Sequence, residues 1–192
     1  MKHHPVFKIP LAGGVAEAVF FNTEESMLAP AFSSFSREAL RLEKIFNFYD
    51  ETSELSLLNK KRAMLASKEL LEVIALAIRY SKLTNGAYDI SLGKNFLRRK
   101  QGLEGLSLSC SYKDIQLYGK SIILTHPDVM VDLGSIAKGY IVDRLCEVLE
   151  GEGIESALVD IRGDMRVFGS HKETLEIMHP REDKGMLPFT FS

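Results

Sequence analysis

Short strand pairs separated by helical stretches are the feature that most limits how this 192-residue sequence can fold. Residues 6–21, 114–125 and 155–169 each read as two extended runs joined at a glycine-containing turn. Between them, apolar residues recur at three- and four-residue spacing, as on one face of an amphipathic helix. Hairpins interrupted by helices favour an α+β fold over a regular parallel βαβ fold.

Three segments carry the helical pattern. The first runs from about Ser26 to Phe46 and has an aromatic and aliphatic stripe, which we interpret as core packing rather than as a cofactor site. The second begins after Ser67, a good N-cap, and ends at residues 84–86, where Asn and Gly favour a left-handed stop. The third is predicted from Ser135 to about Glu150.

The remaining stretches are predicted to be less regular. Residues 47–61 read as a polar loop, and "LRRKQ" (97–101) as a solvated loop within a glycine-containing stretch. Residues 129–133 read as a short strand and residues 175–178 as the last strand. The end of the chain, "GMLPFTFS", is expected to be an unpaired or a poorly covered strand.

Composition excludes several classes of protein. The chain is 45% hydrophobic and has a net charge of -2, which fits a globular domain and argues against a nucleic-acid surface. Two cysteines are too few for a disulfide framework or a zinc site. The sequence has no stretch of eighteen apolar residues, no leader and no lipobox cysteine, so we expect a cytoplasmic protein without a membrane span.

The segment "VDLGSIAKGYIVDRL" (131–145) breaks local rules. Lys138 falls in the first turn of the third predicted helix, where the helix dipole disfavours cations, and Gly139 follows it. A phosphate at the helix start would make the positive charge of Lys138 favourable there. Because Gly134 has no side chain, it would let the phosphate approach the backbone closely. Alternatively, Gly134 and Ser135 form only a turn and an N-cap, Lys138 reaches solvent, and Gly139 packs against a strand.

Four segments resemble one known family. "DLGSIAKGYIVDRL" and "GIESALVDIRGDMRVFG" are similar to the D-L-G-G-I-A-K-G-Y-A-V-D and G-G-D motifs of the ApbE flavin transferases. "FYDETSELSLLN" (48–59) and "YSKLTNGAYDISLG" (80–93) are similar to two further motifs of that family, in the same order. The resemblance covers about residues 10–181.

The resemblance implies a fold and an activity. It implies a single ApbE-like domain over residues 1–192, with a T-fold-related mixed or antiparallel sheet, packed helices and an incomplete second half. It implies Mg²⁺-dependent transfer of FMN from FAD to a Ser or Thr of an acceptor protein, with release of AMP. It singles out no catalytic residue, makes Ser135 a metal ligand, and assigns these contacts with FAD: Tyr49, Ala87, Tyr88, Asp89, Asp132, Lys138, Gly163 and Asp164.

Several of these residues also have a structural explanation. Tyr88 reads equally as a core tyrosine and Tyr49 as the end of the aromatic stripe. Asp89 can be a turn residue after Asn85 and Gly86. The turn at Gly163 and Asp164 is explained as well by a plain hairpin.

The sequence departs from the family pattern at three places. The family's M-G-T is "AGG" (12–14), and the first glycine of G-G-D is Arg162. The later segments H-x-x-x-P-x-T-G and a-D-A-x-x-T, which supply Asp and Thr to magnesium, have no counterpart before Ser192. The alternative functions are therefore a non-catalytic FAD binder, a split or truncated homologue, and an FAD pyrophosphatase.

Overall fold

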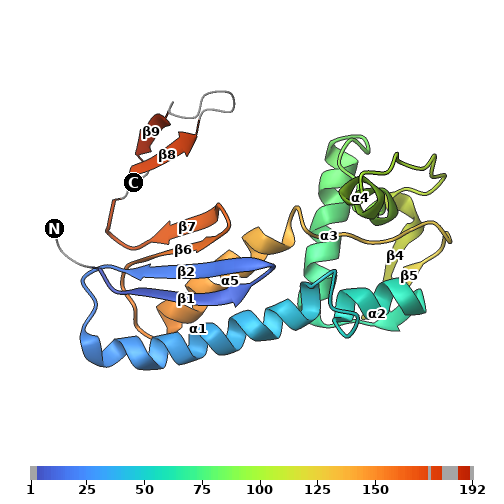
Figure 1. The fold of residues 1–192 in the computed structure, drawn as a ribbon. Coiled ribbons are helices and arrows are strands. Elements are labelled where there is room, and N and C mark those ends of the chain that lie inside the picture. The colour runs from blue at the N-terminus through green and yellow to red at the C-terminus, as the bar shows by residue number, and fades with distance from the viewer. Residues whose placement is uncertain (1–3, 173, 179–185, 191–192) are drawn as a thin grey trace. The chain divides into compact units, whose positions relative to one another are not determined.

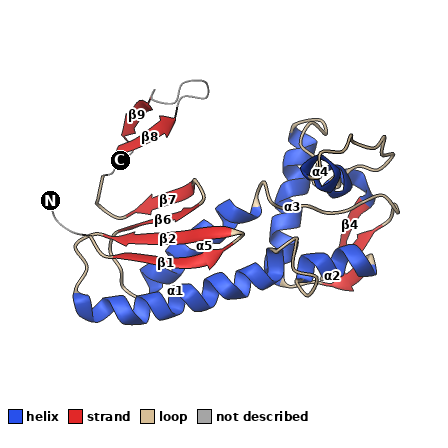
Figure 2. Cartoon of the chain, in the orientation of Figure 1, coloured by secondary structure: helices blue, strands red, loops and turns tan. Residues whose placement is uncertain are grey.

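The structure is a computed structural model that describes residues 4–172, 174–178 and 186–190 (Figure 1). The chain divides into two compact units, one of residues 1–38 with 142–192 and the other of residues 39–141. Helices and strands alternate along both, as predicted for an α+β fold (Figure 2). In chain order the elements are β1 (Val6–Leu11), β2 (Gly14–Phe20), α1 (Glu25–Phe46), α2 (Glu54–Lys61), β3 (Ala63–Leu65), α3 (Lys68–Leu83), α4 (Gly93–Lys100), η1 (Tyr112–Asp114), β4 (Ile115–Tyr118), β5 (Ser121–Leu124), α5 (Ala137–Gly151), β6 (Ala157–Ile161), β7 (Asp164–Phe168), β8 (Thr174–Met178) and β9 (Met186–Thr190).

The first unit is built on an antiparallel sheet of order β1-β2-β6-β7. Its two hairpins have two-residue turns in which both central residues have positive φ, the pattern of a type I′ turn. These residues are Ala12 and Gly13 in one hairpin and Arg162 and Gly163 in the other. Both predicted hairpins are confirmed, and β1 is an edge strand as expected.

The core of this unit lies between the sheet and the parts of α1 and α5 that belong to it (Figure 1). The rings of Phe7 in β1 and Phe32 in α1 lie 4.6 Å apart, and Arg166 in β7 pairs with Asp143 in α5 at 3.0 Å. Burying each large apolar side chain contributes about 1.5–3 kcal/mol. The buried apolar residues of these elements are Ile9, Leu11, Ala16, Ala18, Phe20, Ala31, Phe35, Val142, Leu145, Cys146, Leu149, Ala157, Val159, Ile161 and Phe168.

The second unit contains a smaller antiparallel sheet of order β3-β5-β4 and the helices α2, α3 and α4. Helix α3 follows the prediction closely. Ser67 caps it by accepting a hydrogen bond from the amide of Leu70 at 3.2 Å, and Asn85 and Gly86 follow its end with positive φ. The predicted hairpin of residues 114–125 is confirmed as β4 and β5.

The predicted loop at residues 47–61 is wrong in its second half. Helix α2 occupies Glu54–Lys61 because Ser53 caps it, accepting a hydrogen bond from the Ser56 amide, and because Leu55 and Leu58 are fully buried. The edge strand β3 after it was not predicted. The polar residues around these leucines concealed a short amphipathic helix.

The prediction for the end of the chain is also corrected. The strand β9 is paired with β8, antiparallel, from Thr174 opposite Thr190 to Met178 opposite Met186. The described residues therefore place both strands of this segment in one ladder.

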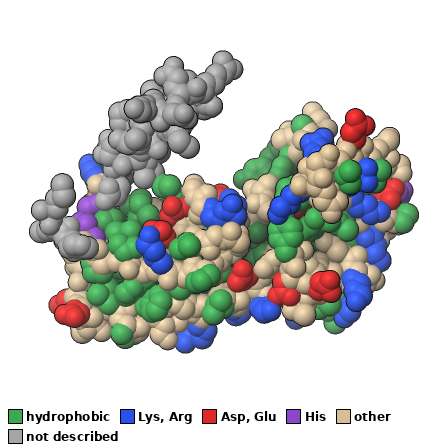
Figure 3. All heavy atoms as spheres, viewed as in Figure 1, with side chains coloured by type: hydrophobic (Ala, Val, Ile, Leu, Met, Phe, Trp, Pro, Cys, Tyr) green, Lys and Arg blue, Asp and Glu red, His purple; other side chains and the backbone are tan. Residues whose placement is uncertain are grey.

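The surface mixes charges of both signs. Acidic and basic side chains are interspersed over the face drawn in Figure 3. Among the described helices, none combines the length and the apolar character that crossing a membrane requires.

Candidate functional site

The segment predicted as a strand at residues 129–133 is extended but forms only an isolated bridge, between Met130 and Leu92. Its backbone is paired with the loop before α4. The amides of Met130 and Asp132 donate to the carbonyls of Ser91 and Ile90 at 3.0 and 2.9 Å. The strand prediction is therefore wrong. The hydrogen bonds nevertheless place segments of two sequence motifs side by side.

Asn59, the last residue of the 48–59 motif, holds the same segment from the other side. Its amide nitrogen donates to the Val131 carbonyl at 2.9 Å, and its amide oxygen accepts from the Val131 N–H at 2.7 Å. Val131 is fully buried, so these bonds replace the strand partner that its backbone lacks. Sequence reasoning did not identify this role.

Asp132 shapes the turn into α5. Its Oδ1 accepts a hydrogen bond from the Gly134 amide at 2.9 Å, and the helix begins at Ala137, two residues later than predicted. A Cβ at Gly134 would lie 3.2 Å from that same Oδ1, closer than most real contacts. Glycine at this position therefore lets the carboxylate fold back over the turn.

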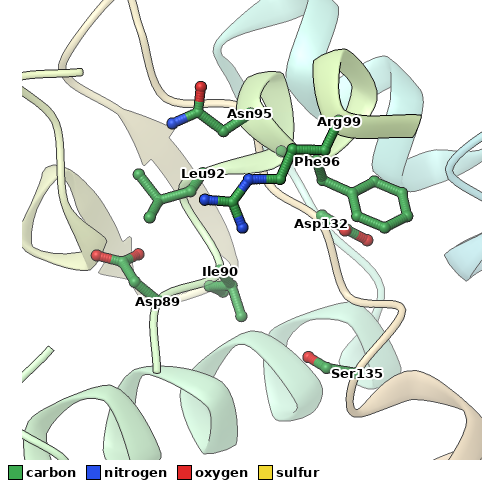
Figure 4. Close-up of a pocket in the computed structure, with 9 residues that line it drawn as sticks. Asp89, Ile90, Leu92, Asn95, Phe96, Arg99, Asp132 and Ser135 are labelled. Atoms are coloured by element: carbon green, nitrogen blue, oxygen red, sulfur yellow. The ribbon is translucent and has the colours of Figure 1, made fainter. Parts of the chain in front are cut away.

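A cavity of about 240 Å³ opens between this turn and α4. Figure 4 shows three groups of residues around it, from the loop before α4, from α4 itself, and from the segment leading into α5. Its lining residues carry two carboxylates, one guanidinium, one amide and one hydroxyl, together with apolar groups. The lining residues are Asp89, Ile90, Leu92, Gly93, Asn95, Phe96, Arg99, Asp132 and Ser135.

Helix α4 contributes residues that sequence reasoning missed. Asn95, Phe96 and Arg99 lie on one face of this helix because residues three and four apart are neighbours on a helix surface. The prediction of a solvated loop at residues 97–101 is wrong, since α4 extends to Lys100. The spacing of Asn95, Phe96 and Arg99 fits one face of a helix and could have predicted α4. The glycines on both sides of this segment favoured a loop instead.

Tyr88 is half-buried and lies beside the helix start. Its Oη is 3.1 Å from Ser135 Oγ. Burial raises the pKa of the Tyr88 phenol above 10, the Ser135 hydrogen bond partly offsets this rise, and the Asp132 charge adds to it. Tyr88 is therefore a neutral phenol at physiological pH and can donate to, or accept from, the Ser135 hydroxyl.

Asp89 has a structural role in addition to lining the cavity. Its Oδ1 accepts from the Ser91 amide at 2.8 Å and its Oδ2 accepts from the Tyr112 amide at 2.9 Å. The interpretation of Asp89 as a turn residue thus fits the structure. Contact of its carboxylate with a ligand stays a prediction.

Comparison with known proteins agrees with the motifs that meet at this cavity. The profile of the ApbE family matches residues 15–190. The chain belongs to the ApbE family.

Relatives in this family are distant and longer. The chain is 28% identical over 141 residues to an FAD:protein FMN transferase of Vibrio cholerae and 30% identical over 151 residues to one of Haemophilus influenzae. Each alignment covers 65% of this chain and 42% of the relative. The chain thus spans about two fifths of the length of these curated relatives.

Solved ApbE structures share the fold. The flavin transferase ApbE of Vibrio cholerae superposes with a TM-score of 0.81 at 21% identity, over 98% of this chain and 68% of that one. The ApbE protein of Thermotoga maritima gives a TM-score of 0.83 at 20% identity, over 98% and 68%. These comparisons confirm the predicted mixed α+β, ApbE-like fold.

Within this ApbE-family chain, two predicted FAD contacts lie at the surface of the second unit. Ala87 is exposed, and Tyr49 is 57% exposed. The Tyr49 hydroxyl accepts a hydrogen bond from Lys100 Nζ at 2.8 Å. Its ring lies 5.5 Å from that of Phe48, which in turn lies 6.3 Å from Phe96 at the cavity.

Lys138 and Gly139 occupy the first turn of α5, as the anion-site interpretation requires. Lys138 is half-buried, three residues after Ser135. Apart from its chain neighbours and the backbone of its own helix, no described atom lies within 4 Å of the position that a Cβ would take at Gly139, so the structure does not place a strand against this glycine. Lys138 as an FAD contact stays a prediction.

Gly163 and Asp164 belong to the first unit, in the β6–β7 turn. The Gly163 amide donates to Asp160 Oδ1 at 2.7 Å, a local turn bond. Arg162 lies across the β1–β2 turn: its Nη1 donates to the Ala12 carbonyl at 3.2 Å, and its Cδ would meet a Cβ at Gly14 at 2.6 Å. The two departures from the family motifs at Arg162 and "AGG" are thus in mutual contact.

The donors for a metal ion are few. The described residues contain no group of three or more His, Cys, Asp or Glu that could share one. At the cavity, the hydroxyl of Ser135 and the carboxylate of Asp132 are hard oxygen donors of the kind that Mg²⁺ accepts together with water and phosphate oxygens. The assignment of Ser135 as a ligand stays a prediction.

Proposed function

We propose that this chain binds FAD in the manner of an FAD:protein FMN transferase and supplies the nucleotide-binding part of that activity. The main support is the meeting of the family's sequence segments in one place. Residues from "AYDISLG" and "DLGS" line a single cavity, and Asn59 of the 48–59 segment fixes the backbone between them. Segments far apart in the sequence therefore build one site.

The proposed reaction transfers FMN from FAD to a Ser or Thr hydroxyl of an acceptor protein. The hydroxyl oxygen forms a bond to the FMN-side phosphorus, the bond from that phosphorus to the AMP oxygen breaks, and the hydroxyl proton goes to a base. Mg²⁺, when bound, offsets charge on the phosphates. The chain's own residues bind and orient the nucleotide: Asp132 and Ser135 lie just before the first turn of α5, where the helix dipole favours an anion.

The size of the cavity limits what it holds. Sites for drug-sized ligands occupy about 300–1,000 Å³. The 240 Å³ at this site therefore accommodates one part of FAD, and the rest of the dinucleotide lies outside it.

The test is a titration of FAD into the purified chain with and without Mg²⁺, followed by flavin fluorescence and by chromatographic assay of AMP. We expect saturable binding that weakens at least tenfold in Asp132→Asn, because a ligand hydrogen bond to a charged group contributes about 1.5–3 kcal/mol. Glu25→Gln, which removes an exposed carboxylate of α1 in the other compact unit, is the matched control and should bind as the unmodified chain does.

The products separate the related activities. Transfer to a Ser- or Thr-containing acceptor with release of AMP supports a transferase, and AMP with free FMN supports an FAD pyrophosphatase. Binding without AMP supports a flavin-nucleotide binder. An absence of FAD binding, with a folded chain by circular dichroism, contradicts the proposal.

A further inference from the structure

Helix α4 carries four basic side chains, and three of them are held by contacts within the chain. Lys94 pairs with Asp128 at 2.8 Å, Arg98 donates from Nε to the Glu104 carbonyl at 2.8 Å, and Lys100 donates to Tyr49. Arg99 makes no hydrogen bond or ion pair with any residue that the structure describes. The helix therefore presents one guanidinium whose donors are unused.

That guanidinium faces the cavity. Arg99 lines the space together with Asp89, Asp132 and Ser135, and Figure 4 shows its side chain extending from α4 into the region that they surround. Basic residues at the end of a helix are favoured by the helix dipole alone. The dipole does not explain, however, why this side chain is directed toward a cavity instead of toward a partner within the chain.

We propose that Arg99 binds a phosphate of the nucleotide that occupies this cavity, and so acts as a specificity-determining residue for phosphorylated over unphosphorylated flavins. The proposal rests on the proposed function, since it assumes a nucleotide at this site. It adds a ligand contact from α4, whose residues after Gly93 lie outside the four sequence segments that resemble the family.

Charge and geometry favour phosphate. Asp89 and Asp132 place two carboxylates in the cavity lining, which repel a pyrophosphate unless a cation lies beside it. A guanidinium offers a planar fork of donors that matches two phosphate oxygens, which an ammonium does not. Phe96, one helical turn before Arg99, supplies an apolar wall and keeps water from one side of such a contact.

The experiment compares the binding of FAD, riboflavin and ADP to the full chain and to Arg99→Gln, Arg99→Lys and Arg98→Gln. Riboflavin has the ring without phosphate, and ADP has the pyrophosphate without the ring. We expect Arg99→Gln to weaken FAD and ADP about tenfold to a hundredfold and riboflavin less than twofold. Arg99→Lys should give an intermediate loss for FAD and ADP, because it keeps the charge and loses the fork.

Two controls accompany this comparison. Arg98→Gln removes an adjacent guanidinium that does not line the cavity, and it should leave all three affinities unchanged. The FAD affinity of the unmodified chain should fall more steeply with salt than that of Arg99→Gln, because the variant lacks a screened charge contact. Arg99 is exposed, so its variants should unfold at the same temperature as the parent chain.

The outcomes separate this proposal from the proposed function. FAD binding that is unchanged in Arg99→Gln overturns the role of Arg99 and leaves the FAD function standing. Equal losses for FAD and riboflavin overturn it as well, since the contact would then be with the ring. Arg99-dependent binding of ADP without any FAD binding supports the phosphate contact and rejects the flavin function. Binding of none of the three ligands overturns both.

Discussion

At the scale of single residues, neighbours in one motif have different roles. Tyr88 and Asp89 both belong to the "AYD" segment that resembles the family's FAD-binding residues. The Asp89 carboxylate is occupied by two backbone amides and shapes the loop, whereas the Tyr88 hydroxyl meets Ser135 at the helix start. A motif match therefore identifies the site but does not assign each side chain to the ligand.

The Tyr88 phenol should titrate above its ordinary range. Burial and the Asp132 charge hold its phenol neutral, so its pKa lies above 10. The folded chain binds this proton more tightly than the unfolded chain, so the stability that it contributes is present below pH 10 and is lost as the pH rises through the raised pKa. We expect Tyr88→Phe to remove the late part of the tyrosinate absorbance curve near 295 nm.

A tyrosinate curve whose late part is unchanged in Tyr88→Phe would contradict the shielding of the Tyr88 phenol that the structure indicates.

At the scale of elements, α2 connects the local sequence to the site. Its two buried leucines and its Ser53 cap make it a helix, and its last turn presents Asn59 to Val131. The extended segment before α5 therefore depends on a side chain from another element instead of on a neighbouring strand. The position of this extended segment should therefore depend strongly on the side-chain amide of Asn59.

Asn59→Ala should destabilise the chain by about 2–4 kcal/mol. The substitution leaves the N–H and C=O of a fully buried residue without partners, and each unsatisfied group costs about 1–3 kcal/mol. The measurement is urea unfolding followed by circular dichroism. Lys60→Ala, at the adjacent exposed position on α2, should change stability by less than about 0.5 kcal/mol. A similar small effect for Asn59→Ala would show that water replaces the amide.

At the scale of the whole molecule, the predicted FAD contacts are distributed over both compact units. Gly163 and Asp164 lie in the unit built on the four-stranded sheet. The other unit contains Tyr49, Ala87, Tyr88, Asp89, Asp132 and Lys138. The cavity and Arg99 belong to the second unit alone, so ligand binding should be detected there first.

FAD should slow amide hydrogen exchange in residues 87–93 and 129–137 and leave the β4–β5 hairpin unchanged. Binding stabilises the folded state by about 2.7 kcal/mol at a ligand concentration of one hundred times Kd. Bound FAD therefore suppresses the local opening of the cavity segments, and their amide exchange slows accordingly. Exchange measured by mass spectrometry at saturating FAD tests this, with Asp132→Asn as the variant in which protection should decrease. Protection confined to β4 and β5 would contradict the location of the site.

The sequence by itself determined the elements whose signals are local. The turns at Ala12–Gly13 and Arg162–Gly163 join strands with alternating apolar residues. Helix α3 has a capping serine just before its first residue and an Asn-Gly stop just after its end. These predictions hold because the energies involved arise between residues a few positions apart. The helical pattern likewise predicted a third helix from Ser135 with Lys138 in its first turn, and the structure begins this helix at Ala137.

Only the tertiary structure decided which residues meet. Residues 129–133 resemble a strand, yet the backbone of this segment is paired with a loop and with Asn59, 72 residues before Val131. Arg99 reads as one cation in a basic run, and only the position of α4 directs it into the cavity. Such contacts join segments that are far apart in the sequence, so no local pattern of residues predicts them. The free energy that stabilises these contacts comes from burial and from hydrogen bonds that exist only in the folded chain.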